Sequence, residues 1–132
     1  MKFERTSTVG WTVYWYFDAD GSDAEVIVGR LLAVDASLEV VKRTEKILSE
    51  GINDFGFTYT SMKNMSSIIV IGASSSGKEF LNSYVHELRH IVDDISAYYN
   101  LDNEESAYLT GDISNSVAEI ICKFSCDECR KK

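Results

Sequence analysis

The chain has 132 residues, of which 45% are hydrophobic and 26% are charged, which is typical of a globular domain and excludes a disordered or fibrous protein. A chain of this length can bury roughly two-thirds of the surface that it exposes when unfolded, so we expect residues 1–132 to form a single domain without disulfides. The formal net charge of −8 repels phosphate backbones and argues against nucleic acid as a partner.

The first half of the chain predicts one strand followed by two helices. Residues 9–17 are rich in β-branched and aromatic side chains and stop at an Asp-Gly turn signal, which is typical of a strand. Ser22 and Glu25 have the spacing of a capping box, and apolar residues recur behind them at helical spacing to about Val34. Residues 35–50 predict a second amphipathic helix.

The second half predicts two strands and two long helices. Residues 55–60 and 66–72 are strands joined by a short polar loop. Amphipathic helices follow over about residues 78–100 and from residue 102 or 103 to about Phe124. The order β-α-α-β-β-α-α predicts an α+β fold with about three strands.

Both histidines lie on the first of these long helices, in the pattern His86-Glu87-Leu88-Arg89-His90. One helical turn separates His86 from His90, so both imidazoles can reach one metal ion, with Glu87 beside them and within reach of a metal-activated water. At about 100° per residue, the histidines lie roughly 160° from the centre of the apolar stripe at Leu88. They are therefore not core histidines, and the pattern favours a zinc site over a solvated helix face.

The pattern H-E-x-x-H resembles the zinc metallopeptidases called zincins. The metzincin branch is excluded, because its longer motif needs a glycine where Asp93 stands and a third ligand where Ser96 stands. The remaining pattern looks like the gluzincins, zinc peptidases whose third ligand is a glutamate on the following helix, often within E-x-x-A.

Glu104-Glu105-Ser106-Ala107 supplies that element, and the resemblance implies that Glu104 is the third zinc ligand. Glu104 precedes apolar residues of its own helix by five and nine positions, as His86 does, so both point away from their apolar stripes. Glu105 stays open as the ligand, although it can instead complete a capping box with Asp102. Thirteen residues separate His90 from Glu104, a short link for this group.

The resemblance, which covers about residues 66–124, implies an unusually small zincin-like domain with an active-site helix and a C-terminal glutamate helix. Zinc would be held by His86, His90 and Glu104, and Glu87 would act as general base and then acid in the hydrolysis of a peptide or protein substrate. The small size also suggests an alternative, a catalytically inactive zinc-binding interaction module. A third reading is a helical remnant without metal.

Three neighbouring features have roles that depend on this reading. Residues 66–72 look like the edge strand along which zincins bind an extended peptide. Asp94 is either the acceptor for the second ring N–H of His90 or part of a solvated acidic face. Tyr108 either donates to an oxyanion or packs against other aromatic residues.

Two other patterns are weaker. Residues 72–78 resemble a phosphate-binding P-loop, but Glu79 stands where the loop needs a hydroxyl for Mg²⁺. Cys122, Cys126 and Cys129 have the spacing of iron–sulfur radical enzymes, which need a barrel too large for this chain. A second zinc on three thiolates and simple free thiols both stay open.

Cysteine usage and hydropathy predict a cytoplasmic protein. The longest apolar run, residues 68–71, is far below the roughly 18 residues of a membrane span, and the N-terminal residues lack the apolar stretch of a signal peptide. We therefore expect no membrane partner. Three cysteines, an odd number, fit a reducing compartment. The sequence does not indicate an oligomeric state.

Overall fold

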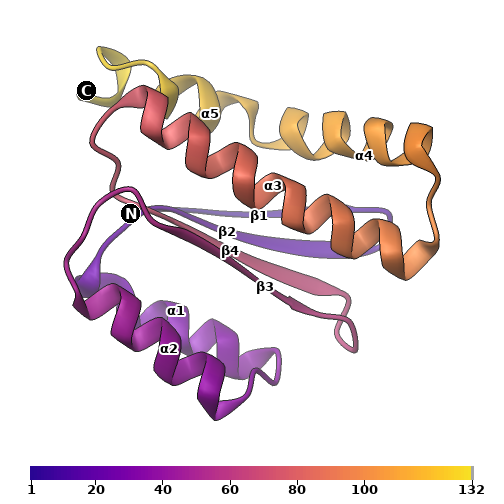
Figure 1. Cartoon of the computed structure of the whole chain (residues 1–132), viewed down its shortest axis with the longest axis horizontal. Helices are drawn as coiled ribbons and strands as arrows, with labels where there is room; N and C mark the ends of the chain where they lie inside the picture. The colour runs from indigo at the N-terminus through magenta and orange to yellow at the C-terminus, as the bar shows by residue number, and fades with distance from the viewer. Residues whose placement is uncertain (132) are drawn as a thin grey trace.

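A four-stranded mixed sheet separates two layers of helices in the computed structural model, which describes residues 1–131 (Figure 1). The strands are β1 (Lys2–Thr8), β2 (Trp11–Ala19), β3 (Gly56–Ser61) and β4 (Ser66–Gly72), in the sheet order β1-β2-β4-β3. The central strands β2 and β4 are parallel, and each pairs with an antiparallel edge strand. The α+β class predicted from the sequence is confirmed.

The helices cover both faces of this sheet. On one face lie the short 3-10 turn η1 (Gly21–Asp23), α1 (Ala24–Ala33) and α2 (Leu38–Ser49). On the other face lie α3 (Gly77–Tyr99), α4 (Asn103–Ser116) and α5 (Ala118–Ser125), followed by the 3-10 turn η2 (Cys129–Lys131). All seven residues of β4 are buried, because both of its faces are covered and it has a strand on either side.

The sheet has four strands where the sequence predicted about three. The missed strand, β1, has an exposed or half-exposed polar pattern and pairs with β2 through the two-residue turn Val9-Gly10, in which both residues have positive φ. An edge strand needs no continuous apolar pattern, because one of its faces and its outer edge stay in solvent. The Val-Gly pair is also not a typical hairpin signal.

The position of residues 66–72 corrects a second expectation. These residues form β4, which lies between β2 and β3 and therefore has no free edge for a peptide. The edge strand beside α3 is β3.

The last predicted helix is two helices, α4 and α5, which are separated at Val117. This residue has φ −122° and ψ 18°, outside the helical range, and its side chain is buried in the core. The hydroxyl of Ser116 donates to the carbonyl of Ile113 and competes for helical acceptors at the break. No glycine or proline marks this position, so the sequence pattern reads as continuous.

The capping interactions of the long helices agree with the sequence more closely. Ser76 caps α3, and Asn100 ends it in the left-handed conformation. Asp102 and Glu105 form the predicted capping box at the start of α4. Within residues 1–131, every helix is too short or too polar to cross a lipid bilayer.

The core predicts a clear contrast between two isoleucine substitutions. Ile69 is fully buried between α3 and the sheet, whereas Ile52 is 52% exposed. Ile69→Ala should lower the free energy of unfolding in urea by about 2–5 kcal/mol, because it removes buried surface and leaves a cavity. Ile52→Ala should change it by less than about 0.5 kcal/mol. Equal effects of the two substitutions would contradict this core.

Candidate metal centre

The middle of α3 carries the motif, and the burial of its apolar stripe fixes the direction of each motif side chain. Leu88, Ile91 and Ile95 are buried against the sheet. His86 and His90 are therefore exposed on the outer face of the helix, as the sequence predicts. Glu87 lies between these two faces and is only 4% exposed.

The two imidazoles face each other through their Nε2 atoms, which lie 3.3 Å apart. Two nitrogens bound tetrahedrally to one zinc ion, each at about 2.0–2.1 Å, are about 3.3 Å apart. The ligand atoms of His86, Glu87 and His90 all lie within 4.8 Å of one another. This His-Glu-His group could therefore hold a metal ion.

The carboxylate of Glu87 is held from the side by β3. The hydroxyl of Thr58 donates a hydrogen bond to Oε1 of Glu87 at 2.9 Å. Gly56, two residues earlier on the same face of β3, lies so close that a β-carbon there would be 2.9 Å from Oε2. A glycine at this position leaves room for the carboxylate, and the threonine gives a buried charge one of the partners that it needs.

A second polar contact on β3 decides the role of Asp94. The hydroxyl of Thr60 donates to Oδ2 of Asp94 at 2.6 Å and contacts the hydroxyl of Ser67 at 2.9 Å. The indole of Trp11 donates to the same Ser67 hydroxyl at 3.1 Å. Asp94 is thus half-buried and bonded to β3, so it is not part of a solvated acidic face, and within residues 1–131 no hydrogen bond joins it to His90.

Sequence reasoning missed Gly56, Thr58 and Thr60 as site residues. They alternate along β3 with aromatic residues, and that alternation is the signal of a strand with one small and polar face. The pattern does not say which helix this face meets, so it could not connect Thr58 to Glu87.

Glu104 and Glu105 do not belong to the group formed by the two histidines and Glu87, although the structure describes both. The two helices run antiparallel, with the hydroxyls of Ser96 and Ser106 in contact at 2.7 Å, so the first turn of α4 is level with the end of α3. His90 lies ten residues before Asn100, which corresponds to about 15 Å along the axis of α3.

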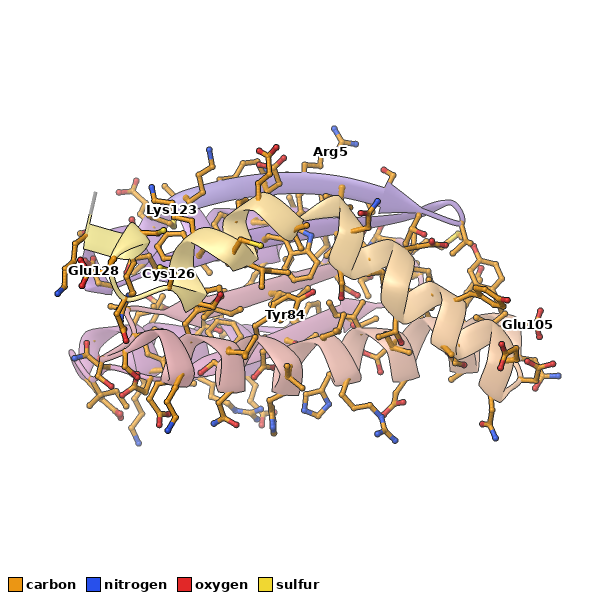
Figure 2. All side chains as sticks on the ribbon, turned by 90° about the horizontal axis from the view of Figure 1, so that it is seen from above. Arg5, Tyr84, Glu105, Lys123, Cys126 and Glu128 are labelled. Carbon is orange, nitrogen blue, oxygen red and sulfur yellow. The ribbon has the colours of Figure 1, made fainter. Side chains whose placement is uncertain are left out.

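Figure 2 shows the same separation along the helices. Tyr84 lies near the middle of α3, and Glu105 lies at the end of α4 that is far from Tyr84. The spacing of Glu104 fixes its direction around the helix axis but not its height along it. Glu105 has the capping role, because its side chain accepts the amide N–H of Asp102.

A groove of about 570 Å³ lies between α3 and α4, and both histidines are among the residues that line it. It is lined by Val85, His86, Leu88, Arg89, His90, Val92, Asp93 and Thr110. Arg89 and Asp93 form an ion pair at 3.0 Å on its outer side. Tyr108 is 69% exposed, so the expected aromatic packing is wrong, and it is not among the residues lining the groove.

In the loop that resembles a P-loop, hydrogen-bond donors already pair with carboxylates of the protein. Asp54 accepts both the amide and the hydroxyl of Ser75 at 2.7 Å, and Asp127 accepts the amide of Gly77 at 2.7 Å. The hydroxyl of Ser75, followed by its amide, lowers the pKa of Asp54, and the amide of Gly77 lowers the pKa of Asp127. These donors are therefore not free for a phosphate, which supports the exclusion made from Glu79.

Comparisons with models of known protein families, with curated protein sequences and with solved structures find no match. The arrangement of the side chains is therefore the basis for a functional proposal.

The bond between β3 and Glu87 predicts a specific response to substitution. Thr58→Val keeps the shape of the side chain but removes the donor, so the free energy of unfolding should fall by about 1–3 kcal/mol. Thr58→Ser keeps the hydroxyl and should recover most of that loss. Urea denaturation of the three proteins measures the effect, and equal stability of the valine and serine variants would count against it.

The capping of α3 by Asp127 predicts a dependence on pH. The pKa of Asp127 is lower in the folded protein than its ordinary value of 3.8, so the cap stabilises the fold above that pH. The stabilisation is lost as the pH falls through the lowered pKa. Asp127→Asn should be less stable than the wild type at pH 6, and the difference should shrink below pH 3.8. Thermal melts across this range provide the measurement.

Proposed function

We propose that this protein is a zinc-dependent metallopeptidase related in its site chemistry to the zincins, the peptidases with the H-E-x-x-H motif. The observation that carries the proposal is the 3.3 Å separation of the Nε2 atoms of His86 and His90, with the carboxylate of Glu87 in the same group. Two imidazoles one helical turn apart, with a carboxylate beside them, form the H-E-x-x-H arrangement in which the histidines bind zinc and the glutamate acts as general base.

Each residue has a defined task in this proposal. His86 and His90 would hold the metal through Nε2, and a zinc ion bound there would supply Lewis-acid chemistry and lower the pKa of water to about 7. Glu87 takes up a proton from the attacking water and passes it to the leaving amine. Oε1 of Glu87 accepts from Thr58, whereas Oε2 accepts no hydrogen bond from residues 1–131 and is free to take the proton.

The position of β3 supports a peptide as the substrate. It is an edge strand, and Thr58 places it directly beside Glu87. An extended peptide can add to such an edge through main-chain hydrogen bonds. Its scissile carbonyl would then lie near the two histidines, and the adjoining groove offers apolar walls from Val85, Leu88 and Val92 for a side chain.

The second candidate is a zinc-binding interaction module without turnover. It is favoured by the absence of Glu104 from the group and by the proximity of Glu87 to both histidines, within 4.8 Å, in the described residues. If Glu87 is itself the third ligand, the site has no general base. The role of Glu87 therefore separates the two candidates.

A cytoplasmic location is part of the proposal. It is supported by the three cysteines, all of which are unpaired in the part of the chain that the structure describes.

Zinc titration of four proteins tests the proposal. His86→Ala and His90→Ala should each lower zinc affinity by at least about tenfold, since even the loss of an outer-shell partner costs that much. Glu104→Gln should leave affinity within about twofold of the wild type, because its carboxylate lies outside the group. Equal zinc content in the wild type and His86→Ala would rule out the proposed metal site.

Glu87→Gln then distinguishes peptidase from module. A peptidase variant should keep its zinc affinity and lose cleavage of an unfolded protein substrate, whereas a module should lose zinc affinity. Glu79→Gln is the matched control, because Glu79 is exposed on the same helix but outside the group. Undiminished cleavage by Glu87→Gln would rule out the assigned mechanism.

A further inference from the structure

Three cysteines lie in α5 and in the segment that follows it, and Cys126 lies at the end of the molecule opposite Glu105 (Figure 2). Cys122 is on α5, Cys126 follows that helix directly, and Cys129 begins η2. All three are free, and Cys122 and Cys129 are exposed. Nothing in the metal centre uses them.

The chain turns sharply between Cys126 and Cys129. The amide of Arg130 donates to the carbonyl of Cys126 at 3.0 Å, and the amide of Cys129 donates to the sulfur of Cys126 at 3.4 Å. Residues three apart in such a turn have α-carbons less than about 7 Å apart. A disulfide spans about 4.4–6.8 Å between α-carbons, so the two thiols are within bonding reach without a change of fold.

The two thiols are chemically unequal. The amide of Cys129, the thiol of Cys129 and the amide of Glu128, in that order, lower the pKa of Cys126. Its hydrogen bond to Cys126 raises the pKa of Cys129. Cys126 therefore loses its proton more readily than Cys129, and the thiolate is the nucleophilic form of a cysteine.

The turn is also fixed to the rest of the protein. Asp127, between the cysteines, accepts the amide of Gly77 at the start of α3. Arg130 donates to the carbonyl of Ser74 and pairs with Asp127 at 3.5 Å. A β-carbon on Gly77 would collide with the carbonyl of Ser125, so this close approach requires glycine. These contacts fix the turn that carries both cysteines to the rest of the protein.

We propose that Cys126 and Cys129 are a redox-active dithiol that reacts with low-molecular-weight disulfides and closes a reversible intrachain disulfide around Asp127. The thiolate of Cys126 attacks one sulfur of the disulfide, whose S–S bond breaks, and the departing thiolate takes up a proton. Cys129 then loses its proton, attacks the sulfur of Cys126 and expels the second thiol. Two protein thiols are oxidised, and one disulfide is reduced to two thiols.

Glutathione disulfide is the probe for this reaction, and digestion with trypsin makes the product identifiable. Trypsin cuts after Lys123 and Arg130, so the peptide of residues 124–130 contains both cysteines and leaves Cys122 in the preceding peptide. The reduced full-length protein is incubated with glutathione disulfide, alkylated and digested. Mass spectrometry should find peptide 124–130 with two hydrogens fewer and with no alkyl group, and Cys122 alkylated.

Single substitutions then test the order of the steps. In Cys129→Ser, the reaction should stop at a glutathione adduct on Cys126. In Cys126→Ser, no intrachain disulfide should form. Cys122→Ser is the control and should oxidise at the wild-type rate. A disulfide that includes Cys122, or faster glutathione addition at Cys129 than at Cys126, would overturn the proposal.

An experiment with added zinc distinguishes a redox-active dithiol from a metal site that is formed by the three thiolates. Zinc is added to His86→Ala, in which the histidine pair is removed, before alkylation. The proposal expects all three thiols to alkylate as fast as without zinc. Protection of all three by stoichiometric zinc would assign the cysteines to a metal and refute the redox assignment.

Discussion

The packing of α3 on the sheet is the constraint on which the metal centre depends. Leu88, Ile91 and related residues of its apolar stripe must be buried, and this burial fixes the rotation of the helix about its own axis. With that rotation fixed, His86 and His90 face outward, one turn apart. Glu87, between them in sequence, is turned toward β3. A rotation by one residue in one direction would place His90 where Ile91 is buried, and a rotation in the other direction would expose the carboxylate of Glu87.

The edge of the core at β3 is held by hydrogen bonds as much as by apolar contact. Thr58 and Thr60 reach two different carboxylates of α3, and Thr60 also joins a buried chain through Ser67. Such a network specifies register, because a slip of β3 by one residue would direct Phe57 and Tyr59 at those carboxylates. An edge strand, which has only one neighbour, gains a defined position in this way.

The sequence predicted those features that depend on local periodicity and capping. The ends of β4 and α3 and the outward direction of the histidines belong to this group. Features that depend on contacts between residues far apart in the chain were not predicted from the sequence. Strand β1 is held by its pairing with β2, and the partner of Glu87 comes from a strand 29 residues away. The height of Glu104 along α3 depends on how α4 packs against that helix, with Ser96 in contact with Ser106, which helical spacing does not report.

Both ends of α3 are fastened by segments that are remote along the chain. Asp127 binds its first turn across 50 residues, and the carbonyl of Val9 accepts the hydroxyl of Tyr99 across 90 residues. Contacts of this separation form late and slow the folding of a domain. During synthesis, α3 therefore leaves the ribosome before Asp127 can bind its first turn, and the helix that carries the histidines gains this contact only when the cysteine turn has been made.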